Sequence, residues 1–331
     1  MAKALDLEEL TRLYELMMTI EHRMKEIGED FSYEKQVLEN RLEHLRKPLL
    51  GELSPWEKVM IARHQKRPTA LDLIPHLFDD YTEMHGDRYF GDDPAISGGI
   101  AWFGDEPVTV IAQQKGRNTK ENIKRNFGMP NPEGYRKSLR LMKQAEKFGR
   151  TVICFVDTPG AYPGVGAEER GQAFAIANNL LEMSWLRVPI ITIVIGEGGS
   201  GGALALGIGD RVYMLEHAIY SVISPDGAAA LLWKDASLAE KAAELLKITA
   251  QDLFQYQIID GIIPEPGVGA HFSLTDTAKQ IRQHLSLAIA ELHSCEIAEL
   301  IEQRYEKFMK MVRFTESEQT IASSAKPSIL V

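Results

Sequence analysis

The feature that most constrains this fold is a glycine-rich run that follows directly on an apolar segment. Residues 195–209 read IGEGGSGGALALGIG, straight after the apolar run 188–195. This pattern is typical of a buried strand that turns into a helix, and the first N–H groups of a helix have no acceptor within it. The run therefore predicts a turn that holds negative charge, whether a phosphate or an oxyanion.

The same run fits two well-known motifs. Its residues 196–201 fit the dinucleotide pattern G-x-G-x-x-G, and residues 198–202 fit the serine-hydrolase pattern G-x-S-x-G. The dinucleotide motif should open the first βα unit and precede an acid by about 20 residues. Here at least two such units come first, and the next acids, Asp210 and Glu216, stand too close. A P-loop is excluded because 196–209 contains no lysine.

The hydrolase motif remains an alternative. Ser200 would be the nucleophile, and Asp260 and His271 follow it in the order that the elbow requires. The pattern is weak, however, where almost every residue is glycine, and acids and histidines are plentiful in this chain. Under other interpretations Ser200 is a turn residue or a helix cap.

The composition excludes several classes of protein. The chain has 331 residues with a net charge of -10, which argues against a general nucleic-acid binder. No apolar run approaches the ~20 residues of a membrane span, and the N-terminus has no apolar signal core. The two cysteines, Cys154 and Cys295, have no Cys or His at ligand spacing. We therefore expect no metal site and a location in a reducing cytoplasm.

The middle of the chain alternates between strands and helices. This β-α-β-α-β order predicts a parallel sheet with crossover helices, entered through a hairpin with its turn at 104–107. The expected strands are 97–103, 108–113, 151–156, 188–195, 211–215 and 219–223. The expected helices are 133–148, 168–186 with apolar Phe174, Ala177, Leu181 and Trp185, one from about 199, 236–246 and 273–292.

Both ends of the chain differ from this core. Leu7, Leu10, Tyr14 and Met17, and then Leu38, Leu42 and Leu45, recur at helical spacing on either side of Gly28. This predicts a helical hairpin over 1–50, which either packs on its own domain or docks a partner chain. A main domain is expected over 51–293, followed over 294–331 by a helix and a frayed tail.

Two glycine-rich turns, at 157–166 and 196–202, lie one βα unit apart. The carboxyl ends of parallel strands meet at one edge of a sheet, so both turns should lie at the same site. Neither turn contains a histidine. This favours chemistry in which the protein supplies an oxyanion hole and the substrate supplies the base.

A basic segment precedes them. Lys115, Arg117, Lys120, Lys124 and Arg125 lie within eleven residues of an otherwise acidic chain. The segment 116–134 is non-periodic, which favours a loop that clamps phosphates or carboxylates. The alternative is a solvated face.

Long blocks of this sequence are similar to a known family. They are QKGR at 114–117, RNFGMP at 125–130, PEGYRK at 132–137, DTPGAYPGVGAEERG at 157–171, IGEGGSGGALAL at 195–206, YSVISP at 220–225 and IIPEP at 262–266. Over about 71–271 the chain resembles the alpha-subunit family of the acetyl-CoA carboxylase carboxyltransferases of bacteria and plastids. The C-terminal tail matches only loosely.

The resemblance implies an α/β fold of the ClpP/crotonase type, a β-β-α superhelix with the helical hairpin at its N-terminus. It implies transfer of a carboxyl group from carboxybiotin, held on the biotin carboxyl carrier protein, to acetyl-CoA. The product is malonyl-CoA, in the first committed step of fatty acid biosynthesis. A related acyl-CoA such as propionyl-CoA is an alternative substrate. The compartment would be the bacterial cytoplasm or the plastid stroma.

The resemblance also implies partners and assigns cofactors to them. A beta subunit of the same fold would carry a zinc ribbon, and two alpha with two beta subunits would form the complex. Biotin carboxylase would use the ATP, so this chain would bind no cofactor of its own.

By resemblance, the backbone N–H groups of Gly201 and Gly202 form an oxyanion hole, most naturally on the biotin side. The ureido enolate left on biotin can take the methyl proton of acetyl-CoA, so no protein base is needed. The expected substrate-binding residues are Gly160, Ala161, Gly164, Gly166, Gly198, Gly199, Lys115, Arg117 and Arg125.

Overall fold

The computed structural model describes residues 12–13, 16–17, 19–20, 23–24, 26–28, 30–50 and 53–311, with backbone only for 43–50. At its centre is an eight-stranded sheet in the order β1-β2-β3-β4-β5-β6-β8, with β7 paired to β5. The strands are β1 (Asp79–Glu83), β2 (Ile96–Phe103), β3 (Glu106–Gln113), β4 (Thr151–Thr158), β5 (Ile190–Gly199), β6 (Arg211–Leu215), β7 (Ile219–Ser221) and β8 (Gly261–Ile263).

The sheet is mixed. Strands β1, β2 and β3 pair antiparallel, and all pairings from β3 onward are parallel. Every residue of β4 and β5 is buried. Such continuous apolar runs are typical of parallel strands that are covered on both faces. The predicted parallel sheet with crossover helices is confirmed.

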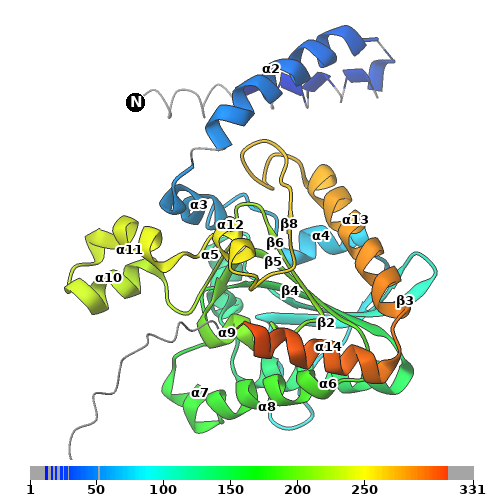
Figure 1. The fold of residues 1–331 in the computed structure, drawn as a ribbon, viewed down its shortest axis with the longest axis vertical. Helices are drawn as coiled ribbons and strands as arrows, with labels where there is room; N and C mark the ends of the chain where they lie inside the picture. The colour runs from blue at the N-terminus through cyan, green and yellow to red at the C-terminus, as the bar shows by residue number, and fades with distance from the viewer. Residues whose placement is uncertain are drawn as a thin grey trace, which may run out of the picture.

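Helices cover both faces of this sheet. They are α2 (Ser32–Leu50), α3 (Pro55–Ala62), α4 (Ala70–Leu77), α5 (Thr119–Lys124), α6 (Pro132–Phe148), α7 (Val165–Glu169), α8 (Gln172–Trp185), α9 (Ser200–Leu204), α10 (Pro225–Trp233), α11 (Ala239–Leu246), α12 (Ala250–Gln255), α13 (Leu274–His293) and α14 (Ile297–Lys310), with 3-10 turns at Asn126–Gly128 and Ala236–Leu238. In Figure 1, α6, α8 and α14 lie below the sheet and α4 and α13 above it, while α10 and α11 project to one side.

The N-terminal segment is helical on both sides of Gly28, as predicted. Met17 and Leu42 are buried in one cluster with Val268, and Phe272 packs against it. The two helical segments therefore pack on each other and on the 266–272 loop of the main domain. Leu7, Leu10 and Tyr14 lie outside the described residues, as does the side chain of Leu45. Docking of a partner by this segment stays a prediction.

The structure corrects three predicted elements. The single helix over 168–186 is wrong: it is divided into α7 and α8, because Gly171 between them has a left-handed φ of 82°. Strand β5 continues through the glycines to Gly199, so helix α9 is only five residues long. Strand β7 ends at Ser221 rather than 223, because Ser224 already caps α10.

Two strands, β1 and β8, were not predicted from the sequence. The five residues of β1 are polar and sit on the sheet edge, so they carry no apolar alternation. The three residues of β8 are too few for a periodic pattern. Both are strands because they hydrogen-bond to neighbours that are distant in the sequence.

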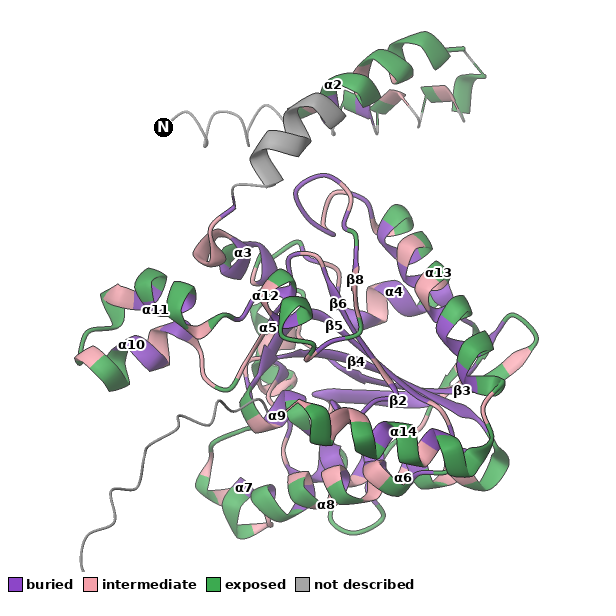
Figure 2. Cartoon of the chain, in the orientation of Figure 1, coloured by how far each residue is buried: buried purple, intermediate pink, exposed green. Residues whose placement is uncertain are grey.

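The large apolar residues predicted for the buried side of α8 do not face the core. Phe174 is 76% exposed, Leu181 60% and Trp185 66%, and residues of the outward side of α8 are green in Figure 2. The buried side instead carries Gln172, Ala175, Asn179 and Met183. A contiguous exposed apolar face of this kind marks an interaction surface more often than an accident of composition.

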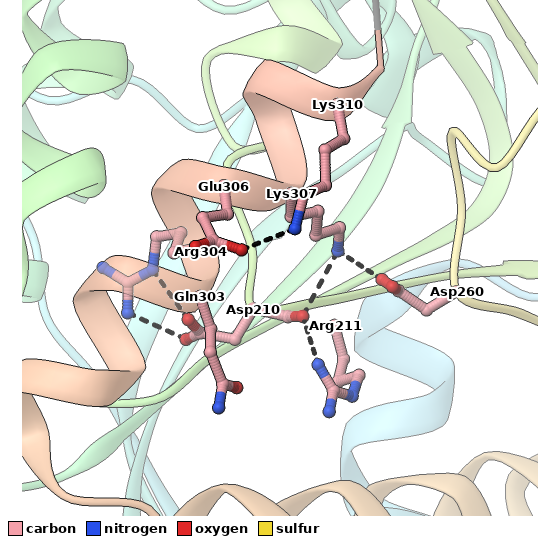
Figure 3. A pocket seen from close by; sticks show the side chains of 8 residues that line it. All are labelled: Asp210, Arg211, Asp260, Gln303, Arg304, Glu306, Lys307 and Lys310. Atoms are coloured by element: carbon pink, nitrogen blue, oxygen red, sulfur yellow. Dashed lines mark hydrogen bonds and ion pairs between the residues drawn. The ribbon is translucent and has the colours of Figure 1, made fainter.

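Helix α14 is fastened to the body by a buried arginine. The Arg304 guanidinium donates to both carboxylate oxygens of Asp210 at 2.8 Å. It also donates to the carbonyls of Met183, Leu186 and Val188. Figure 3 shows Arg304 and Asp210 in a cavity of about 280 Å³, together with Lys307, which pairs with Asp260. Within the described ranges no helix is long and apolar enough to cross a membrane.

Candidate functional site

The glycine run carries the chain from the central strand of the sheet onto its surface. Gly199 ends β5 and precedes α9, where Ser200 is exposed and Gly201 half-buried. Ser200 has a φ of 52°, an uncommon conformation for a residue other than glycine. The strand–turn–helix predicted for this run is confirmed.

The two glycine-rich turns meet, as the sequence predicts. A Cβ atom on Gly202 would lie 2.5 Å from both the Ala161 nitrogen and the Gly160 carbonyl carbon. A Cβ atom on Gly199 would collide with the Pro159 carbonyl group. These glycines are required because the backbones of the two turns touch. Gly201 differs, since a Cβ there would make only ordinary contact with Ile176 at 3.9 Å.

Two backbone N–H groups at this junction have no hydrogen-bond acceptor among the described residues. The Gly201 and Gly202 N–H groups belong to the first turn of α9, so they have no acceptor within it. In the described part of the chain no neighbouring segment accepts from them either. The Gly160 N–H, by contrast, donates to the Thr158 hydroxyl at 3.1 Å. The Gly201 and Gly202 N–H groups are therefore without an acceptor among the described residues, whereas the Gly160 N–H is used within its own turn.

A glutamine at the end of β3 fixes the position of Gly202. The Gln113 side-chain amide donates to the Gly202 carbonyl at 2.6 Å. Gln113 is fully buried, so its geometry is set by the sheet rather than by solvent. The sequence interpretation did not single it out, although its place at the carboxyl end of a strand is the signal that could have done so.

An ionic network lies behind the glycine run. Asp157, at the end of β4, accepts the Glu197 N–H at 2.9 Å and the Lys115 ammonium at 2.7 Å. Arg63 donates to Glu197 at 2.7 Å and to Asp226 at 3.0 Å. Burial opposes the charge on Arg63, but these two carboxylates outweigh it and raise the pKa of the guanidinium.

This network explains why residue 196 is glycine, and it includes Lys115, which was predicted to bind substrate. A Cβ on Gly196 would lie 2.5 Å from an Asp157 carboxylate oxygen, so only glycine lets the carboxylate occupy that place. Lys115 is committed to Asp157 and lies 3.5 Å from Glu197. Its ammonium balances these two carboxylates behind the run, and its binding of substrate stays a prediction.

In the rest of the basic segment, the two arginines bind groups of the chain, whereas Lys120 and Lys124 are exposed. Arg117 pairs with Asp72, and Arg125 donates to the Pro94 carbonyl at 2.7 Å. The arginine and lysine of the following helix, Arg136 and Lys137, pair with Asp87 and Asp92. The segment is thus divided: Lys115, Arg117 and Arg125 bind groups of the chain, and the two lysines of α5 lie on a solvated face. The Arg117 side chain is half exposed and is the better placed of the two arginines to meet a ligand.

The remaining glycines that were predicted to bind substrate differ in burial and in the space around them. Gly198 is buried in β5, where it pairs with Tyr220 of β7. Gly164 caps α7, with the Tyr162 ring so close that a Cβ could not fit. Gly166 lies in the first turn of α7, half exposed. All three line the same turn region as Gly201, though Gly198 has no exposed surface for a ligand.

The structure does not assemble the hydrolase triad. Asp260 pairs with Lys307 at the opposite end of the sheet from the glycine run. His271 stacks on His64, with the ring centroids 4.2 Å apart. Among the described residues, no histidine hydrogen-bonds to Ser200. The hydrolase alternative is therefore wrong in geometry, and Ser200 is a turn residue.

The glycine run is mostly buried, and within residues 196–202 it reaches the surface at Ser200 and, in part, at Gly201. One cavity of about 280 Å³ lies under α14 and another of about 310 Å³ is lined by residues 65–72 with Arg117 and His271. Neither includes a residue of the run. No group of three or more potential metal ligands occurs in the described ranges.

Comparison with known proteins agrees with this geometry. Residues 4–312 match a family described as "Acetyl co-enzyme A carboxylase carboxyltransferase-like". An acetyl-coenzyme A carboxylase carboxyl transferase subunit alpha from Halalkalibacterium halodurans is 61% identical over 293 residues, covering 88% of this chain and 90% of the relative. The same-named protein of Anoxybacillus flavithermus is 58% identical over 323 residues, covering 97% and 99%.

Solved structures agree on the fold. Transcarboxylase 12S has a TM-score of 0.55 at 21% identity, covering 69% of this chain and 44% of that one. A Pseudomonas malonate decarboxylase hetero-tetramer in complex with coenzyme A has a TM-score of 0.54 at 18% identity, covering 67% and 89%. These carboxyltransferase-type neighbours share the crotonase-like fold. The chain belongs to the family of acetyl-CoA carboxylase carboxyltransferase alpha subunits.

Proposed function

We propose that this chain is one half of a carboxyltransferase that moves the carboxyl group of carboxybiotin to acetyl-CoA and forms malonyl-CoA. This reaction is the first committed step of fatty acid biosynthesis. One observation carries the proposal. Two adjacent backbone N–H groups, at Gly201 and Gly202, have no acceptor among the described residues and lie at the junction of two glycine-rich turns.

The reaction needs such donors because negative charge develops on oxygen twice. The carboxylated biotin of the carrier supplies the carboxyl group and a basic ureido oxygen, and the thioester becomes an enolate. In this chain, Gly201 and Gly202 donate to one of these oxygens, on the biotin side. Removal of one oxyanion donor costs about 3 kcal/mol of transition-state stabilisation, or a factor of 100 to 1,000 in rate.

The surrounding residues hold these donors in place. Gln113 fixes Gly202 from the sheet side, and Gly160 with Ala161 packs against Gly202 from the other turn. The network of Asp157 and Lys115 fastens the end of β4 to that of β3. A donor pair held this rigidly is preorganised for the oxyanion and needs little rearrangement when charge develops.

The exposure of the run at Ser200 and Gly201 supports a second chain as the other half of the site. We propose that a beta subunit of the same fold covers the glycine run and supplies the oxyanion hole for the thioester, in an assembly of two alpha and two beta subunits. A side chain at Gly201 would meet Ile176 of α8 at 3.9 Å, so α8 lies beside the run, and its other side carries the exposed Phe174, Leu181 and Trp185. The structurally similar malonate decarboxylase is itself a hetero-tetramer.

The remaining parts of the reaction are proposed to lie on other chains. Biotin reaches the site on the biotin carboxyl carrier protein, a biotin carboxylase uses the ATP, and the beta subunit binds zinc, all in the cytoplasm. Propionyl-CoA is the alternative acyl substrate. Activity assays with acetyl-CoA and with propionyl-CoA decide between the two substrates.

The experiment is an assay of the reverse reaction. The chain is expressed alone and together with a beta subunit, and carboxyl transfer from malonyl-CoA to biocytin is measured. We expect activity from the co-expressed pair and none from either chain alone. Activity of the chain alone would contradict the two-chain site. An inactive but stably associated pair would contradict the carboxyltransferase.

A further inference from the structure

A second site is suggested by the loop over 85–92, which the glycine run does not touch. Two exposed aromatic side chains stand on it: Tyr89 is 85% exposed and Phe90 65%. The Arg136 guanidinium lies over the Tyr89 ring at 5.2 Å, and that of Arg170 lies over the Phe90 ring at 4.7 Å. Exposed aromatic rings on a surface loop are unfavourable in water unless a ligand or partner covers them.

The loop is rigid. The buried Asp87 carboxylate accepts the N–H groups of Tyr89, Phe90 and Gly91 at 2.8–3.0 Å and also the Arg136 Nε at 2.8 Å. Asp92 accepts the Gly86 N–H at 2.8 Å and the Lys137 ammonium at 2.6 Å, and lies 3.1 Å from the His85 ring. These hydrogen bonds fix the loop backbone, and the backbone in turn directs the rings of Tyr89 and Phe90 outward.

Two arginines at this loop form no direct ion pair, although the charges of Asp92 and Asp87 act favourably on Arg140 from a distance. Arg88 donates to the His85 carbonyl at 2.8 Å. Arg140, from α6, donates to the same carbonyl at 3.4 Å and to the Gly86 carbonyl at 3.1 Å. Within the described ranges neither guanidinium lies within 4.0 Å of a carboxylate. Burial and the nearby charge of Arg88 lower the pKa of Arg140.

The carboxylates near these two arginines already have other hydrogen-bond or ion-pair partners. Asp87 pairs with Arg136, and Asp92 with Lys137. Glu83 accepts from the Ser97 hydroxyl at 2.7 Å and lies 4.0 Å from the His85 ring. Two guanidinium groups that reach one oxygen atom can also reach two oxygens of one phosphate, with N–H donors left over for it.

We propose that Arg88 and Arg140 bind the phosphate monoester of a nucleotide, whose base stacks on the open face of Tyr89. The phosphate pairs directly with the two guanidinium groups, and the base covers the exposed ring. The nucleotide is either free or the nucleotide end of a coenzyme A thioester. The site goes beyond the carboxyl-transfer function, and its binding is measured without turnover, so failure of one does not imply failure of the other.

The test is calorimetric titration of the full chain with three probes: adenosine 3′,5′-bisphosphate, adenosine and inorganic phosphate. We expect the bisphosphate to bind most tightly. Arg88→Gln and Arg140→Gln should each weaken its binding on the order of tenfold, as expected for loss of a charged hydrogen bond. Tyr89→Ala should weaken the bisphosphate about tenfold but leave phosphate binding unchanged, and Tyr89→Trp should restore it.

Controls separate binding from folding and from general charge. Arg187→Gln removes an exposed arginine far along the chain and should leave every affinity unchanged. Arg88 is exposed, so its variant should melt at the wild-type temperature even if the Arg140 variant does not. Wild-type affinity in the Arg88/Arg140 double variant overturns the proposal, as does absence of binding of both phosphate-bearing probes.

Competition identifies the source of the nucleotide. If acetyl-CoA displaces the bisphosphate, the site holds the nucleotide end of the thioester, and Arg88→Gln should raise the KM for acetyl-CoA in the assembled enzyme. If both bind together, the site takes a free nucleotide. Either result supports the phosphate site.

Discussion

At the scale of single residues, the glycines of the run are not equivalent. Gly202 and Gly199 cannot carry a side chain because the other turn occupies that space, whereas Gly201 can. A substitution at Gly202 would thus combine a packing defect with any loss of catalysis. Gly201 is the position at which the oxyanion hole is tested without unfolding the protein.

Gly201→Val should therefore fold but lower carboxyl transfer at least about 100-fold, because the added side chain restricts approach to the first-turn N–H groups. Ser200→Ala, one residue earlier, should retain most of the activity, since its hydroxyl has no catalytic partner. Both variants are assayed with the beta subunit, and their melting temperatures are compared. An inactive Ser200→Ala that reacts with a serine-directed phosphonate would reinstate the hydrolase.

Histidines provide a second prediction at this scale. His271 stacks on His64, and burial, followed by the nearby charges of His64 and Arg67, lowers its pKa to about 4 from 6.5. Between these values the unfolded chain binds a proton that the folded chain does not. The stability due to neutral His271 is thus present above pH 6.5 and is lost as the pH falls toward 4.

His271→Gln should make the free energy of unfolding less dependent on pH. The free energy of unfolding of the variant should decline less between pH 7 and pH 5 than that of the wild type, measured by denaturant titration. His76→Gln removes an exposed imidazole and should keep the wild-type slope. Equal slopes in all three proteins would contradict the assignment to His271.

At the scale of elements, the basic segment has two kinds of arginine. Arg117 reaches the surface beside Asp72, whereas Arg125 binds a backbone carbonyl of the neighbouring loop. Arg117→Ala or Arg125→Ala should raise the apparent KM for acetyl-CoA or the biotin substrate, with the larger effect at Arg117. Steady-state kinetics of the assembled enzyme measure this. Unchanged KM values in both variants would leave the segment with a structural role alone.

Helix α14 depends on one residue. Arg304→Met removes every hydrogen bond of the buried guanidinium and leaves the Asp210 carboxylate buried without a partner. We expect the free energy of unfolding to fall by about 3–5 kcal/mol, as for other broken buried pairs, and the helix to become open to proteases. Lys310→Gln breaks an exposed pair with Glu306 and should change little. A protease-resistant Arg304→Met variant would argue against this anchor.

At the scale of the whole molecule, the proposed site is half of an interface with a second chain. Phe174→Glu together with Trp185→Glu places charge on the exposed face of α8, where it costs nothing in the free chain. The double variant should fold normally, fail to co-purify with the beta subunit and lose activity with it. Size-exclusion chromatography and the reverse assay measure these outcomes. A fully active, associated variant would place the interface elsewhere.

The sequence by itself determined the local parts of this protein. The apolar run with its glycine turn, the βα alternation and the conformational freedom of glycine are properties of neighbouring residues, so the parallel sheet and the α9 turn follow from them. The long matching blocks led to the family for the same reason, because they preserve residue type at fixed spacing.

The tertiary structure decided what depends on distant contacts. Only the fold shows that Gly202 touches Gly160, that Arg63 reaches Glu197, and that Lys115 is balanced by carboxylates. It separates Asp260 and His271 from Ser200. It also turns the apolar side of α8 outward, because the sheet is already covered by the opposite side of that helix. Periodicity indicates that a face is apolar, but the identity of what covers that face is a property of the whole assembly.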